Sequence, residues 1–80
     1  MRANRAYRLI VSRGGRVPAM FADPERLDRV EVVEIESGEV VLFWDCPVRE
    51  ASRRIRDLKR SLAQLEAEEF MAHWQRRAEE

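Results

Sequence analysis

The stretch from residue 47 to residue 78 constrains the fold of this chain most strongly. It reads PVREASRRIRDLKRSLAQLEAEEFMAHWQRRA, contains no glycine, and has proline only at its first position. Because proline at the first helical position sacrifices no hydrogen bond, the stretch predicts one α-helix that begins at Pro47. At about 1.5 Å per residue, such a helix is about 48 Å long.

An apolar seam runs along the first part of this helix. Its members recur at steps of three and four residues: Val48, Ala51, Ile55, Leu58, Leu62 and Leu65. Beyond Leu65 the pattern shifts to a second set: Ala67, Phe70, Met71 and Trp74. We therefore expect the first half of the helix to pack on its own domain and the second half to face a different surface.

The part of the chain before residue 45 shows the patterns of short strands. We predict strands over residues 7–12, 17–21, 29–36 and 39–44. Turns at Gly14–Gly15 and Ser37–Gly38 would join them into two antiparallel hairpins. A change of apolar phase between Val32 and Val33 indicates either a β-bulge or a strand that is partly covered on both faces.

The sequence thus predicts an α+β fold with a small antiparallel sheet of about four strands, followed by one long C-terminal helix. Residues 1–6 are expected to form a flexible arm and residues 7–80 a single domain. A small β-barrel with a projecting helix is the alternative architecture. A chain of 80 residues buries only about 60 to 65% of the surface of its unfolded form, so a second chain would add stability.

Two further features favour a partner. Residues 40–44 are apolar at every position, so both faces of that strand should be buried or one should meet another chain. The predicted helix also extends well beyond strands of about 20 Å. We therefore predict a non-enzymatic protein–protein interaction module, a homodimer that associates through the C-terminal helix and the fourth strand. Its expected interface residues are Val41, Phe43, Phe70, Met71 and Trp74.

Charge is balanced overall but sorted along the chain. Residues 46–60 hold six basic and two acidic side chains, whereas residues 61–80 hold two basic and five acidic ones. Two antiparallel copies of the helix would bring the basic half of each near the acidic half of the other. The alternative is a solvated helix without a charged partner. The formal net charge is zero, which gives no overall attraction toward anionic membranes or nucleic acid.

A local arginine cluster supports an alternative function. Residues 1–16 hold five Arg and no acid, and clusters of this kind contact phosphates. The alternative is a small nucleic-acid-binding regulator that uses Arg5, Arg8, Arg13 and Arg16. A second basic cluster lies within residues 49–60, although no known nucleic-acid-reading motif is present.

Few residues are suited to catalysis or metal binding. His73 is the single histidine, and without a second ligand of its kind it favours an exposed or partner-packed role. Cys46 stands near the expected helix start, where a thiol pKa can fall, yet no histidine is near it in sequence to act as a base. We expect no catalytic site, no metal and no cofactor.

The expected setting is the cytoplasm of a bacterium. One cysteine cannot form a disulfide within the chain, and no apolar run is long enough to cross a membrane. The many arginines suggest a GC-rich genome.

Overall fold

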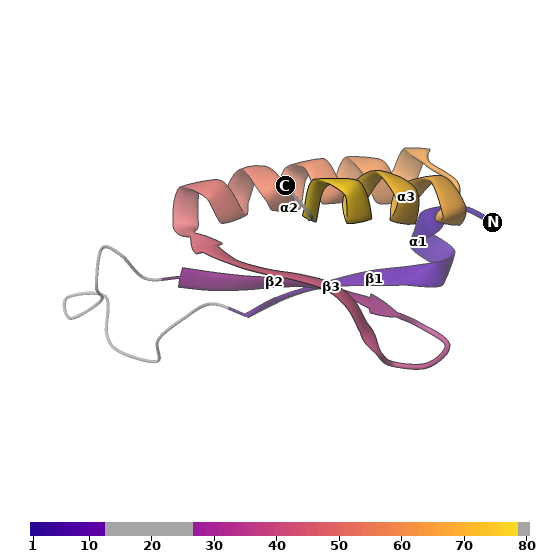
Figure 1. Ribbon diagram of the computed structural model, residues 1–80, viewed down its shortest axis with the longest axis horizontal. Helices are drawn as coiled ribbons and strands as arrows, with labels where there is room; N and C mark the ends of the chain where they lie inside the picture. The colour runs from indigo at the N-terminus through magenta and orange to yellow at the C-terminus, as the bar shows by residue number, and fades with distance from the viewer. Residues whose placement is uncertain (13–26, 79–80) are drawn as a thin grey trace.

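The computed structural model describes residues 1–12 and 27–78. Three antiparallel strands form one sheet in the order β1-β2-β3: β1 (Tyr7–Ser12), β2 (Leu27–Glu34) and β3 (Val40–Pro47). A short helix, α1 (Ala3–Ala6), precedes them, and α2 (Val48–Gln64) and α3 (Ala67–Ala78) follow. Both long helices lie on the same side of the sheet (Figure 1), which makes a two-layer α+β fold.

The core lies between the sheet and these helices. Alternate strand residues point into it, and the register aligns Leu9, Val32 and Leu42 across the three strands. The seam predicted on α2 supplies Ala51, Leu58 and Leu62, and α3 supplies Phe70 and Trp74. The predicted strand at residues 7–12 is confirmed. Its residues alternate between partly buried and exposed positions, as expected for a strand with one covered face.

The pairing is irregular where a β-bulge was predicted, between Val32 and Val33, but the extra residue is on the neighbouring strand. Val32 pairs with Leu42 and Val33 pairs with Val40, so the extra residue, Val41, lies on β3. The bulge changes which residues of β3 face the helices. On β2 itself the alternation is unbroken, so Val32 is buried and Val33 faces the opposite way.

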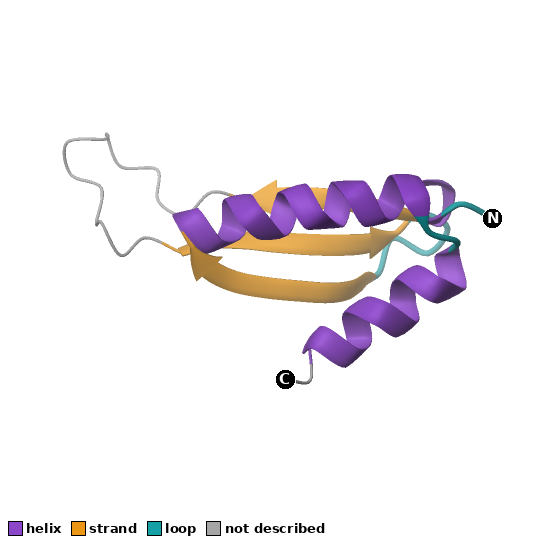
Figure 2. Ribbon diagram, turned by 90° about the horizontal axis from the view of Figure 1, so that it is seen from above, coloured by secondary structure: helices purple, strands orange, loops and turns teal. Residues whose placement is uncertain are grey.

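The prediction of one continuous helix from residue 47 to residue 78 is wrong. The helix ends at Gln64, Leu65 has extended backbone angles (φ −97°, ψ 155°), and α3 begins at Ala67. Figure 2 shows α3 diverging from α2 at this break and running back toward the end of the molecule where α2 begins. The change of direction places the second apolar set of the sequence against the domain's own core, not beyond it.

The first residues hold this break in place. The backbone N–H of Ala3 donates to the carbonyl of Leu65 at 2.9 Å, and the N–H of Ala67 donates to the carbonyl of Met1 at 2.8 Å. The guanidinium of Arg2 donates to the carbonyl of Gln64 at 2.8 Å. These bonds satisfy groups that a helix end leaves unpaired. Residues 1–6 were expected to form a flexible arm. They form a packed segment instead, in which Ala3 is fully buried.

Other predictions are refined or fall outside the described residues. Residues 35–39 connect β2 to β3, a longer connection than the predicted two-residue turn, and Gly38 has a positive φ of 76°. A side chain there would be strained, so glycine suits the position. The predicted strand at residues 17–21 and the turn at Gly14–Gly15 lie outside the described residues, so three of the four expected strands are observed.

Candidate functional site

The face of the sheet that points away from the helices, called the outer face below, is covered by no described element (Figure 1). Large apolar side chains are exposed on it: Phe43 by 58%, Val40 by 48%, Ile35 by 45% and Ile10 by 41%. Phe43 lies in one cross-strand row with Glu31 and Ile10. An apolar cluster of this kind on a small domain marks a candidate interaction surface.

Charged side chains surround this cluster. Arg29 donates two hydrogen bonds to the carboxylate of Asp45, at 2.9 and 3.2 Å. Its guanidinium also lies 5.1 Å from the ring centre of Phe43. The bonds from Arg29 lower the pKa of Asp45 below its ordinary value. Arg29 therefore contacts both Asp45 and the Phe43 ring on the outer face.

A groove of about 170 Å³ lies on the same face. Its walls are mostly apolar and are formed by Arg8, Ile10, Val33, Glu34, Ile35 and Gly38. A cavity of about 150 Å³ can hold a benzene-sized ring. This outer-face groove therefore has room for one aromatic side chain, and Phe43 of the same chain stands on the neighbouring strand edge.

The five residues predicted at an interface separate into two groups. Phe70 and Trp74 are buried in the domain's own core, with 0% and 2% exposure, so their burial requires no partner. Met71 is partly buried against the same core. Val41 is partly buried at the bulge, and Phe43 is the exposed member of the set.

A second groove, of about 230 Å³, separates α2 from α3. It is lined by Glu50, Arg53, Arg54, Asp57, Trp74 and Arg77. The guanidinium of Arg54 lies 5.0 Å from the Trp44 ring and that of Arg77 lies 4.9 Å from the Trp74 ring. The indole Nε1 of Trp74 is buried, and no described residue accepts a hydrogen bond from it. The lining charges are mixed, so this groove does not select a ligand of one sign.

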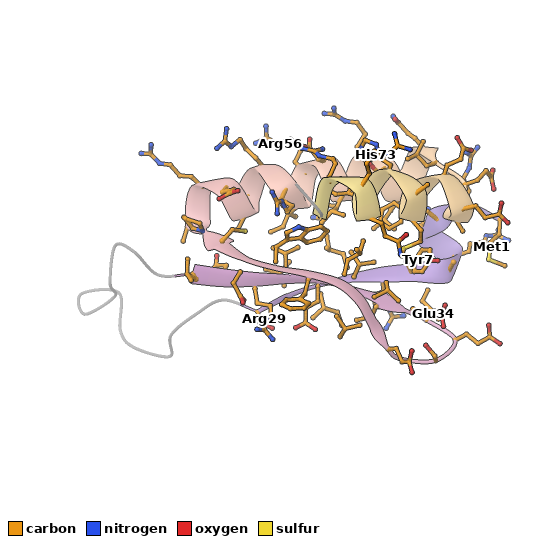
Figure 3. The ribbon with its side chains drawn as sticks, viewed as in Figure 1. Met1, Tyr7, Arg29, Glu34, Arg56 and His73 are labelled. Carbon is orange, nitrogen blue, oxygen red and sulfur yellow. The ribbon has the colours of Figure 1, made fainter. Side chains whose placement is uncertain are left out.

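Cys46 and His73 do not form a catalytic pair. Cys46 lies on β3 opposite Asp28, is 3% exposed, and has a thiol pKa raised by burial. The helix starts one residue after Pro47, so Cys46 is not its cap. His73 is exposed on α3, on the side away from the sheet (Figure 3). Within residues 1–12 and 27–78, no three His, Cys, Asp or Glu side chains are grouped to hold a metal ion.

The predicted N-terminal arginine cluster is described only in part. Arg5 and Arg8 are exposed, and Arg8 lines the outer-face groove. Arg13 and Arg16 lie outside the described residues. Of this cluster the structure therefore places two members, one on α1 and one on β1.

No protein family, curated protein or solved structure matches this chain. Among the described residues, no helix is long and apolar enough to cross a membrane. The evidence for a function therefore lies in the surfaces of the molecule itself.

The outer-face residues Ile10 and Ile35 were not predicted as interface residues. The signal was present, because Ile10 alternates with the partly buried Leu9 and so must face the opposite way. Sequence alternation separates the two faces of a strand. It does not say which face the helices cover, and that choice required the structure.

Proposed function

We propose that this protein is a non-enzymatic interaction module that self-associates through its outer face. The observation that carries the proposal is the exposure of Phe43 beside an apolar groove on the same face. In a two-fold symmetric dimer, a residue that contacts a groove on its partner is matched by the reverse contact. Each Phe43 ring would therefore enter the groove of the other copy, with the two sheets about 10 Å apart.

The charges on the outer face favour a second copy over an acidic or basic partner. The face and its groove carry two cations, Arg8 and Arg29, and three acids: Glu31, Glu34 and Asp45. Arg8 forms no ion pair with any described residue, and it lies at the rim of the groove that would receive Phe43. Asp45, two residues from Phe43, would then approach the partner's rim. A face of mixed charges suits an equally mixed surface.

The size of the face sets the expected affinity. Three strands at about 4.8 Å spacing and eight residues at about 3.3 Å give a sheet of roughly 14 by 26 Å. This is a small area compared with the approximately 800 Å² per partner of a standard stable interface. We therefore expect a weak, reversible dimer with a dissociation constant in the micromolar range.

Association through the helices, as the sequence suggested, has less support. Phe70 and Trp74 are already buried. Glu66 is engaged by the Met1 amino group at 2.8 Å and lies 3.8 Å from Arg2. With these aromatic residues buried, a helix-mediated contact would depend mainly on exposed charges. Each exposed charge pair would contribute at most about 0.5 to 1 kcal/mol, which is too little for a stable contact.

Sedimentation equilibrium tests the proposal over protein concentrations from about 10 to about 500 µM. The wild-type chain should move from monomer toward dimer across this range. The Phe43→Ser variant should stay monomeric because it loses the ring that fills the groove. Ile10→Ser, which changes the groove wall, should weaken association as well.

Val48→Ser is the matched control. Val48 is also an exposed apolar residue, at 38%, but it begins α2 and lies off the outer face. Its substitution should leave the dimer unchanged. A wild-type chain that is strictly monomeric at the highest concentration, or a Phe43→Ser variant that dimerises normally, would refute the proposal.

A further inference from the structure

The outward surface of α2 is a line of arginines. Arg49, Arg53, Arg56 and Arg60 follow one another at steps of four, three and four residues. At about 100° per residue they fall within about 60° of the helix circumference. All four are exposed, and Lys59 stands beside them. We call these four residues the arginine ridge.

The acids of α2 lie to one side of this ridge, next to Arg53. Glu50 and Asp57 line the groove against α3, and Arg53, at the edge of the ridge, lines it as well. Glu50 is paired there with Arg54 at 3.5 Å. No ridge residue forms an ion pair with any other residue in the described ranges. Arg49, Arg56 and Arg60 thus form the part of the ridge that lies away from the groove and its acids.

This arrangement works against the stability of the helix. Arg49 stands in the first turn, near the positive end of the helix dipole, where acids are preferred. Arg56 has like charges at its i−3, i+3 and i+4 positions, namely Arg53, Lys59 and Arg60, and such pairs repel. The last turn of α2, where basic residues are favoured, has none. A bound polyanion would remove this repulsion, whereas packing within the domain does not.

We propose that the arginine ridge binds the phosphate backbone of nucleic acid, without reading its sequence. From Arg49 to Arg60 the ridge is about 16 Å long, which matches about five phosphates along one strand of a duplex. An anionic membrane is a weaker fit, because a surface helix inserts apolar residues between lipid headgroups. On α2 the apolar seam faces the core, and the outward face holds no large apolar side chain.

The ridge is separate from the surface assigned to self-association. In Figure 3, Arg56 points away from the sheet above the helices, whereas Arg29 lies below the sheet on the outer face. Nucleic-acid binding therefore does not depend on the proposed dimer. A variant that fails in one activity should retain the other.

Fluorescence anisotropy with a labelled 20-base-pair DNA duplex of mixed sequence tests the ridge. Four phosphate contacts predict a slope of about −3.6 in a plot of log affinity against log salt, or about a 150-fold loss between about 50 and 200 mM salt. Arg56→Gln should weaken binding, and Arg56→Gln with Arg60→Gln should reduce the slope by about 1.8. Glutamine keeps a good helix propensity, so the helix itself is preserved.

Two controls make the result decisive. Arg76→Gln removes the same charge from an exposed position on α3 and should leave the affinity within about twofold of the wild-type value. Melting temperatures should show that Arg56→Gln is at least as stable as the wild type, since it removes like-charge repulsion. Loss of binding would then not come from unfolding.

Three outcomes would overturn the inference. The first is no binding at low salt. The second is equal weakening by Arg76→Gln and Arg56→Gln. The third is retention of the protein on phosphatidylserine vesicles with no binding to the duplex, which would make a membrane the partner.

Discussion

Replacing Trp74 with alanine should damage the monomer itself. The side chain is 2% exposed, with its ring centre 5.7 Å from that of Trp44 and 6.4 Å from that of Phe70. Removing a buried tryptophan costs about 3 to 5 kcal/mol. A domain of 80 residues has a total stability of about 4 to 12 kcal/mol. The substitution should therefore remove much of the free energy of unfolding.

Urea unfolding followed by far-ultraviolet circular dichroism measures this loss. The protein should be dilute, below the concentration at which it associates, so that only monomer stability is observed. Thermal melting should fall by more than about 12 °C, since 1 kcal/mol corresponds to about 4 to 8 °C in a domain of this size. Circular dichroism is preferred to fluorescence because the substitution removes one of the two tryptophans.

Trp74→Phe is the informative companion variant. It keeps a large ring in the core and loses an indole N–H that donates to no described residue. We expect a cost of about 1 kcal/mol, mainly from the smaller ring. If Trp74→Ala instead unfolded within about 1 kcal/mol of the wild type, Trp74 would not be a core residue, and the packing of α3 described above would be wrong.

Three other predictions follow from single contacts. The Cys46 thiol should react with iodoacetamide more slowly than free cysteine, because burial raises its pKa; a faster reaction would restore the case for a reactive thiol. The pair of Asp45 with Arg29 lowers the Asp45 pKa, so its stabilising effect is present above the ordinary aspartate pKa and lost as pH falls through the lowered value; melting curves of wild type and Asp45→Asn should converge in acid. Gly38→Ala should lower stability by about 1 kcal/mol, because alanine is strained at a positive φ, and urea unfolding would detect this.

The break between α2 and α3 could not be predicted from the local sequence. Gln64, Leu65, Glu66 and Ala67 are all compatible with a helix, so local propensity predicts no interruption. The groups that stabilise the break come from the first three residues, more than 60 positions away. The shift in apolar phase after Leu65 was nevertheless visible. This shift reflects the new direction of α3, which turns its apolar residues toward the same core. The prediction that they face a different surface was wrong.

The sheet was more accessible from sequence. Strict alternation predicted the limits of β1, and the phase change at Val32 marked the position of the irregular pairing, although the extra residue lies on β3. β3 continues to Pro47, beyond the predicted end, because an edge strand tolerates proline where no N–H must be donated. The candidate interface could be predicted only in part. Phe43 was identified from its apolar strand, but the groove beside it is built by residues from β1, β2 and the connection to β3.

The original case for a partner came from a helix too long for its sheet. The break removes that argument, since α3 returns to the domain and buries its aromatic residues. The proposal of a partner rests instead on the outer face, where the apolar strand residues are exposed. A dimer formed there would carry its two arginine ridges on opposite outer sides. Two sites that point away from each other cannot both contact one straight duplex, so dimerisation would not raise DNA affinity through avidity. Such a dimer would instead be suited to holding two separate nucleic-acid segments.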